Sequence, residues 1–299
     1  MNPSLLLTLL LTGLLLAATG WARFRRQRLL ATVRVVTLPL PSRHLGNTRD
    51  VQVFLPPGYD APAAAARRYP VLYVNDGQDA PQLRLRETLA RLTARGHIAP
   101  LIAVAIPTNE NRLQEYGTAV TANAQGLGAR AAAYARFVTA ELLPAVNSQF
   151  RTAMGAEDTA VLGASLGGLS AFDIAWNHLE LFGTVGVFSG SFWWRAGADD
   201  PHVPPGRLIA HEMVRRGPPR PGLRCWFEAA TQDETADRDE NGVIDAIQDT
   251  LELVDELAAH GCRRGVDVVY HEVRGGRHNY ETWSAVLPHF LRWAFPPRA

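Results

Sequence analysis

The sequence predicts a single-domain α/β fold, in which a mostly parallel central sheet is covered by helices on both faces. Short apolar runs of strand length alternate with helix-like segments along most of the 299 residues, and this alternation is typical of such sheets. No repeat and no linker divides the chain after residue 30, so residues 30–299 are expected to form one domain. The 30 basic and 29 acidic residues nearly balance, which gives no indication of nucleic acid as a partner.

The first two strands are expected over residues 31–38 and 50–55. Residues 69–76 and 100–107 contain short β-branched runs bounded by proline, which favours buried central strands. A charged amphipathic helix is expected between them, over 82–95. The remaining expected elements are strands over 159–165, 183–190, 223–230 and 266–273, helices over 129–149, 166–178, 245–260 and 280–294, and an irregular excursion over 195–222.

Residues 1–22 form an uncharged, apolar segment, and a basic cluster follows at 23–28. The apolar run has about the length of a signal-peptide core, and small residues near its end allow cleavage. The basic cluster instead favours an uncleaved anchor with its N-terminus outside, and a misassigned start is a third alternative. We expect export to the periplasm or the extracellular space, with membrane contact only through such an anchor. Export would also allow Cys225 and Cys262 to form a disulfide, although two buried free thiols are favoured.

Ser165 lies between an expected strand and an expected helix, with Gly163, Gly167 and Gly168 around it. A serine at such a turn has a strained backbone that exposes its hydroxyl above the sheet. The backbone N–H of Leu166 then faces the space where an oxyanion would form. This arrangement is the nucleophile elbow of the α/β-hydrolase fold. A glycine-rich turn in an inert domain is the alternative, although the flanking strand and helix make a chance match rare.

A serine nucleophile needs a base, and the base needs an acid that orients it. In this fold the chain order is Ser, then Asp or Glu, then His. His278 follows the last expected strand in a glycine-bearing loop, at the sheet edge where Ser165 is expected. The acid should follow the strand over 223–230, and Asp233 comes first there. The acidic residues shortly after it that could substitute are Glu234, Asp237 and Asp239.

Two further segments have two interpretations each. Residues 237–245 have the spacing of a calcium loop, but Gln248 stands where a bidentate Glu would be needed. A structural calcium ion or a solvated acidic loop would both fit, and the expected ligands are Asp237, Asp239, Asn241 and Asp245. Residues 190–194, with Trp193 and Trp194, follow a strand at the carboxyl edge. These two indoles either line the substrate cleft or cap the core.

Five segments resemble one known family: DVQVFLPPGYD, YPVLYVNDGQD, GASLGGLSAFDIA, LFGTVGVFSGSFWW and GGRHNYETWSAVLPHFLRWAF. Over residues 45–296 the chain is similar to the putative-esterase family, which includes esterase D, enterochelin esterases, feruloyl esterase domains and mycolyltransferases. The resemblance implies an α/β-hydrolase fold and a triad of Ser165, Asp233 and His278. It also implies a second oxyanion N–H at Gln78, and its R-x-x-E-Y segment would line or brace the substrate cleft through Arg112, Glu115 and Tyr116.

The sequence and the resemblance together predict an exported serine esterase that needs no organic cofactor. Its expected substrate is a small-molecule or carbohydrate-linked ester. An acyltransferase that uses a sugar alcohol in place of water would use the same three residues. A non-catalytic binding protein on a hydrolase fold is the alternative of a different class.

Overall fold

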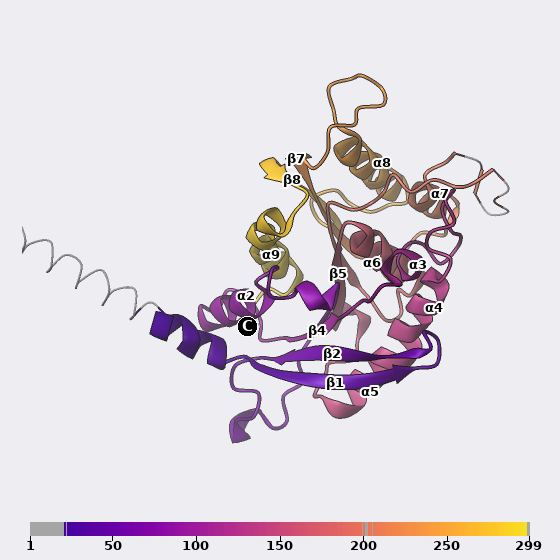
Figure 1. Ribbon diagram of the computed structural model, residues 1–299. Helices are drawn as coiled ribbons and strands as arrows, with labels where there is room; N and C mark the ends of the chain where they lie inside the picture. Colours follow the sequence, from indigo (N-terminus) through magenta and orange to yellow (C-terminus); the bar gives the residue numbers. More distant parts are fainter. Residues whose placement is uncertain (1–20, 22, 199, 201–202, 205, 298–299) are drawn as a thin grey trace, which may run out of the picture.

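An eight-stranded sheet lies at the centre of the computed structural model, which describes residues 21, 23–198, 200, 203–204 and 206–297 (Figure 1). The strand order is β1-β2-β4-β3-β5-β6-β7-β8. β2 runs antiparallel to both of its neighbours, and the strands from β4 to β8 are parallel. The prediction of a mostly parallel sheet is therefore confirmed. The strands are β1 (Arg34–Ser42), β2 (Asn47–Leu55), β3 (Val71–Asn75), β4 (Ile102–Ile106), β5 (Thr159–Ala164), β6 (Thr184–Phe188), β7 (Arg224–Gln232) and β8 (Val268–Arg277).

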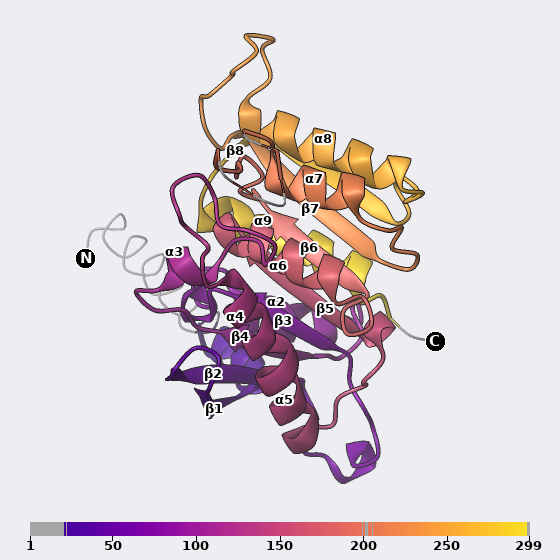
Figure 2. The ribbon, with the colours of Figure 1, turned by 90° about the vertical axis from the view of Figure 1, so that its right-hand side faces the viewer.

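Helices cover both faces of the sheet (Figure 2), and the two faces have separate hydrophobic cores. The helices from α4 to α8 pack on one face, and α2 and α9 pack on the other. The helices are α2 (Leu85–Ala94), α3 (Arg112–Glu115), α4 (Ala131–Arg136), the π-helical η3 (Phe137–Leu142), α5 (Leu143–Gln149), α6 (Leu166–Asn177), α7 (Ile209–Arg216), α8 (Asp245–Ala259) and α9 (Tyr280–Ala294), with short 3-10 turns η1 (Pro62–Ala64), η2 (Gly77–Asp79) and η4 (Ala156–Asp158).

Two of the differences from the sequence expectation concern α7 and β8. The segment over 195–222 contains α7, whose buried side chains include Ile209 and Val214. Eight residues between Pro- and Gly-rich flanks give too short a periodic pattern to indicate a helix. β8 also continues through Gly275 and Gly276 to Arg277, because its pairing with β7 resumes after an irregularity.

The N-terminal and cysteine predictions have different outcomes. The expected leader over 1–22 lies outside the described residues apart from Trp21. None of the helices in the described part of the chain combines the length and apolar character needed to cross a membrane.

Cys225 is buried, Cys262 is half-buried, and both are free thiols.

Candidate active site

Ser165 occupies a strained turn between β5 and α6. Its φ of 55° and ψ of −128° lie outside the regions that non-glycine residues normally adopt. A Cβ atom on Gly163 would collide with the Gly167 carbonyl, so only glycine allows this turn. The Ser165 N–H donates to the Phe188 carbonyl over 2.8 Å, which ties the turn to the end of β6. Leu166 follows as the first residue of α6, where a backbone N–H has no partner within the helix.

His278 directly follows β8 and contacts Ser165. The imidazole Nε2 lies 2.9 Å from the Ser165 Oγ, which is hydrogen-bonding distance. The His278 Nδ1 lies 3.7 Å from the Asp233 Oδ1, slightly beyond a direct hydrogen bond. The imidazole packs edge-to-face against Trp283, at 5.1 Å between ring centroids. The structure thus brings together the three residues expected at the carboxyl edge of the sheet.

Asp233 follows β7 and is held from both sides. Its Oδ2 accepts the Ala230 N–H over 2.8 Å, and its Oδ1 accepts the Ser189 hydroxyl over 3.0 Å. The side chain is only 1% exposed, against 39% for His278. Gln232 and Arg277, the residues just before the acid and the histidine, are register partners in the β7–β8 pair. The two side chains therefore extend from neighbouring strand ends.

A buried polar cluster behind Asp233 was not foreseen from the sequence. The Trp283 Nε1 donates to the Ser189 Oγ over 2.9 Å, and the Glu228 Oε2 lies 3.4 Å from the same oxygen. Glu228 is fully buried. Burial, with the charge of Asp233 as a smaller cause, raises the pKa of Glu228 from 4.5 to about 8. The signal in the sequence was an acid inside an otherwise apolar strand.

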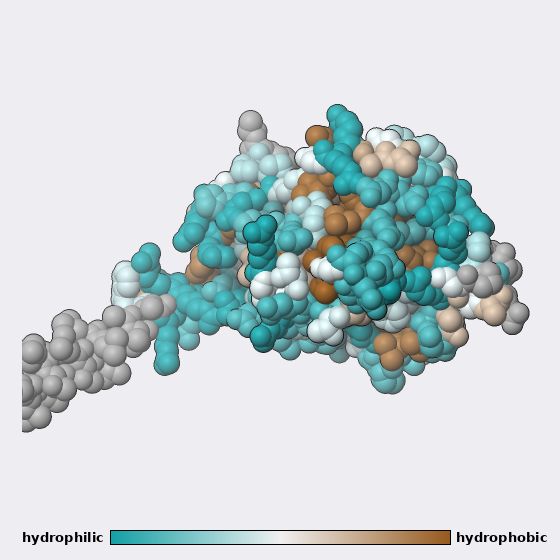
Figure 3. All heavy atoms as spheres, turned by 90° about the horizontal axis from the view of Figure 1, so that it is seen from above, coloured by the Kyte–Doolittle hydropathy of each residue, from teal (hydrophilic) through white to brown (hydrophobic). Residues whose placement is uncertain are grey.

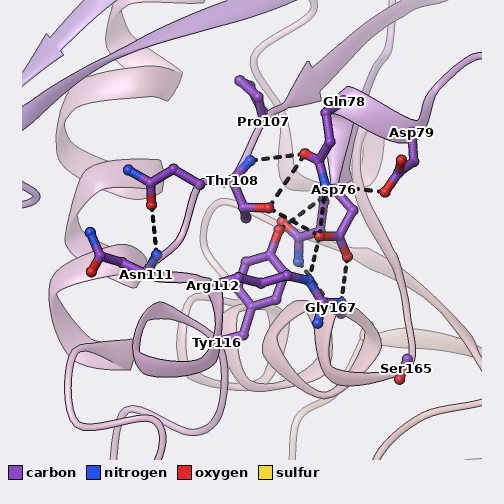
Figure 4. Close-up of polar contacts among 12 residues, drawn as sticks. Asp76, Gln78, Asp79, Pro107, Thr108, Asn111, Arg112, Tyr116, Ser165 and Gly167 are labelled. Atoms are coloured by element: carbon purple, nitrogen blue, oxygen red, sulfur yellow. Dashed lines mark hydrogen bonds and ion pairs between the residues drawn. The ribbon is translucent and has the colours of Figure 1, made fainter.

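The loop after β3 lies beside the start of α6. The Asn75 Nδ2 donates to the Gly167 carbonyl over 2.8 Å. Asp76 adopts a left-handed φ of 55°, and its carboxylate accepts two hydrogen bonds from Arg112, over 2.6 and 2.8 Å (Figure 4). Gln78 comes two residues later, and its side-chain Oε1 accepts the Thr108 N–H over 2.9 Å. This loop therefore holds the expected second oxyanion residue in a fixed position.

Tyr116 supports this loop and Glu115 pairs with Arg49, and neither lines a substrate cleft, because both are fully buried. The Tyr116 hydroxyl accepts the Asp76 N–H over 2.9 Å. Both carboxylate oxygens of Glu115 lie 2.7 Å from the Arg49 Nη2. The expectation that the pair contacts substrate is wrong, and the alternative that it braces the cleft agrees with these contacts. Arg112 is partly exposed and supports the loop through Asp76.

The two tryptophans after β6 have different environments. Trp194 is 1% exposed, and its ring lies against Gly117 and Gly128. Because the ring is buried against these glycines, the expectation that Trp194 contacts substrate is wrong. Trp193 is 48% exposed and remains accessible to a ligand. Hydrophobic side chains gather at the centre of the face seen from above in Figure 3, inside a hydrophilic rim.

The residues of the predicted calcium loop do not gather as a metal-ligand group in the described structure, so calcium binding stays a prediction. Within the described residues, no group of three or more His, Cys, Asp or Glu side chains could hold a metal ion. The Asp237 carboxylate accepts the N–H groups of Asn241 and Gly242, over 3.1 and 2.8 Å. The others in the predicted set also have internal partners: Asp239 accepts from Gln248, Asn241 donates to Gln248, and Asp245 pairs with Arg238. Ligand spacing was present, but the carboxylates are directed at the loop's own donors.

Comparison with known proteins identifies the family of the chain. The family model described as "Putative esterase" matches residues 42–294. The chain belongs to this family. Among curated proteins, this family member is 26% identical over 166 residues to the uncharacterized protein YbbA of Bacillus subtilis, a match that covers 54% of this chain and 64% of YbbA. It is 30% identical over 164 residues to the iron(III) enterobactin esterase of Dickeya dadantii, covering 54% of this chain and 34% of that enzyme.

The chain thus spans less than two thirds of the length of either curated relative. Among solved structures, a ferulic acid esterase superposes with a TM-score of 0.68 at 19% identity, covering 88% of this chain and 98% of the other. At this identity the superposition shows the fold alone. The family match and the superposition confirm the predicted esterase family and its α/β fold.

Proposed function

We propose that this protein is a serine esterase that hydrolyses a carboxylic ester through Ser165, His278 and Asp233. The observation that carries the proposal is the 2.9 Å contact between the Ser165 Oγ and the His278 Nε2 at a strained turn. A serine hydroxyl becomes a nucleophile when an adjacent base can take its proton. Membership of the esterase family and the enterobactin esterase relative support the same reaction class.

In the proposed reaction, the Ser165 Oγ attacks the acyl carbon while His278 takes its proton. His278 then gives the proton to the leaving alcohol, and water resolves the acyl-enzyme with His278 again as base. Asp233 orients and stabilises the imidazolium. Its 3.7 Å separation from the His278 Nδ1 must shorten by about 0.8 Å for a direct charge-assisted bond, and such bonds commonly tighten when substrate binds.

The oxyanion is proposed to form between the N–H groups of Leu166 and Gln78. Leu166 begins α6, so the helix dipole adds to its N–H. The loop carrying Gln78 is braced by the Asp76–Arg112 ion pair. The proposed substrate class is a small-molecule or carbohydrate-linked ester, and the exposed Trp193 is the proposed contact for its apolar part. Export through residues 1–22 stays a prediction, which fractionation of cells expressing the full chain would test.

The test is covalent labelling of the full chain with a fluorophosphonate, followed by intact mass and peptide mapping. We expect one adduct on Ser165, which Ser165→Ala abolishes. Ser191→Ala is the matched control, because the Ser191 Oγ lies only 3.5 Å from the Ser165 Oγ. Ser191 should not be labelled, so this variant should keep the adduct on Ser165. His278→Ala should lower kcat for p-nitrophenyl acetate by about three to four orders of magnitude. Absence of an adduct on the folded protein would refute the proposal.

A further inference from the structure

The Ser189 hydroxyl connects Asp233 to two residues of other elements. Ser189 follows β6, Glu228 lies in β7 and Trp283 lies in α9. The Glu228 Oε2 is 3.4 Å from the Ser189 Oγ, and the Trp283 Nε1 is 2.9 Å from it. Asp233 is the third neighbour, at 3.0 Å. All of these groups are buried. Solvent therefore cannot satisfy whichever of them is left without a partner.

With Asp233 ionised, the donors and acceptors of this cluster fit together in one way. A serine hydroxyl has one hydrogen and two acceptor lone pairs, and an indole N–H can only donate. Trp283 therefore occupies one lone pair of Ser189. An ionised Asp233 can only accept, so the hydroxyl hydrogen points at it. The second lone pair then faces the Glu228 Oε2, and a favourable contact there requires Glu228 to donate a proton.

The electrostatics agree with a neutral Glu228. The Glu228 Oε1 has no hydrogen-bond partner within the described structure, and a buried carboxylate in that state would be strongly disfavoured. Burial and the nearby Asp233 charge raise the pKa of Glu228 to about 8. Asp233, by contrast, accepts two hydrogen bonds. The negative charge is therefore better stabilised on Asp233 than on Glu228.

The backbone of Ser189 adds an independent observation. Its φ is +46°, a left-handed conformation that is costly for residues other than glycine. A glycine would relieve that cost but would remove the hydroxyl that joins the cluster. Backbone strain kept at a buried polar residue beside a candidate active site is consistent with a requirement for its side chain.

We propose that Glu228 and Ser189 are positioning residues for Asp233: a protonated Glu228 donates to Ser189, and Ser189 donates to Asp233, which holds the acid opposite His278. The inference rests on the proposed function, because both residues act through Asp233 and touch no substrate. No proton crosses the cluster during turnover; the hydrogen bonds fix the Asp233 carboxylate.

The proposal implies a loss of kcat on the alkaline side. The titratable groups that face Glu228 are Asp233 after β7, and Tyr270 and the register partner His271 on β8. Burial lowers the pKa of His271, so His271 is neutral in the alkaline range. The turn after β6 presents Ser189, and α9 presents Trp283. Burial raises the pKa of Tyr270 above its usual range, so Tyr270 stays neutral. When Glu228 loses its proton it can no longer donate, and it repels Asp233. Wild-type kcat should therefore fall as the pH rises above about 8.

The experiment compares Glu228→Gln with Glu228→Met in the full chain, using p-nitrophenyl acetate between pH 6 and 9.5. The amide of Gln can donate as a protonated acid does, so we expect kcat within about 3-fold of wild type at pH 7 and no alkaline fall. Glu228→Met should lower kcat at least about 10-fold and leave KM within about 2-fold. Ser189→Gly, which suits the backbone and removes the hydroxyl, should lower kcat similarly and serves if Glu228→Met does not fold.

Glu212→Met is the matched control, because Glu212 is a buried acid on α7 that pairs with Arg215 and Arg216 and should leave kcat unchanged. Unchanged kcat in folded Glu228→Met and Ser189→Gly would overturn the positioning proposal. Equal losses in Glu228→Gln and Glu228→Met would also overturn it. Fluorophosphonate labelling of wild-type Ser165 separates these results from failure of the proposed function, because without that adduct the esterase proposal itself falls.

Discussion

Replacing Glu228 by Gln should stabilise the protein by an amount that grows with pH. Below pH 4.5, Glu228 is protonated in both the folded and the unfolded protein. Between pH 4.5 and about 8 only the folded protein keeps the proton, so unfolding releases it and wild-type stability falls as pH rises. At 1.36 kcal/mol for each pKa unit, raising the pKa from 4.5 to about 8 corresponds to at most about 5 kcal/mol. Glutamine has no proton to lose and avoids this penalty.

The assay is urea unfolding followed by tryptophan fluorescence at pH 5, 6.5 and 8. The difference in unfolding free energy between Glu228→Gln and wild type should be below about 1 kcal/mol at pH 5. It should then rise by about 1.4 kcal/mol for each pH unit and level off above pH 8. Other titrating groups are common to both proteins, so they cancel in the difference. The exposed Glu110→Gln serves as the control and should give no trend.

A constant difference between wild type and Glu228→Gln from pH 5 to pH 8 would refute this reasoning. That result would mean that Glu228 is already ionised in the folded protein at neutral pH. The hydrogen-bond directions inferred for Ser189 would then be wrong as well. A trend of opposite sign would show that the folded protein stabilises the Glu228 carboxylate.

Four further substitutions test the supporting structure and the exposed Trp193. Arg49→Met should lower the unfolding free energy by about 3–5 kcal/mol, because it leaves Glu115 buried without its partner; urea unfolding checks this, and adding Glu115→Met should recover much of the loss. Gly77→Ala should lower kcat at least about 10-fold, since its Cβ would collide with the backbone of β4, and a wild-type kcat would contradict this. Trp194→Ala should cost about 3–5 kcal/mol of unfolding free energy. Trp193→Ala should cost less than about 1 kcal/mol and act mainly on KM for aryl esters.

Local sequence signals predicted the parts of the site that lie on single elements. The pattern over 280–294 marked α9, which the structure has as Tyr280–Ala294 with Asn279 as its cap. The glycines around Ser165 indicated the turn because one of them is sterically required there. His278 was placed at the correct sheet edge because it follows a strand.

Contacts between distant elements could not be predicted in the same way. The Ser189 cluster joins residues 39 and 94 positions apart, and no periodic pattern encodes such a meeting. The calcium-loop spacing could not decide between a metal site and a solvated loop, because spacing does not say where each carboxylate finds its partners. Trp193 and Trp194 were left open for a similar reason, since adjacent residues in irregular backbone can face opposite environments.

The register pair Gln232–Arg277 at the end of the β7–β8 ladder makes the distance between acid and base a property of the sheet. Adjacent strands are held about 4.8 Å apart by their hydrogen bonds, whatever the length of the chain that connects them. The segment between Asp233 and α8 can therefore be lengthened, shortened or exchanged without respacing Asp233 and His278. New loops could be grafted there to change the proposed ester specificity, while the sheet keeps the separation of Asp233 and His278 constant.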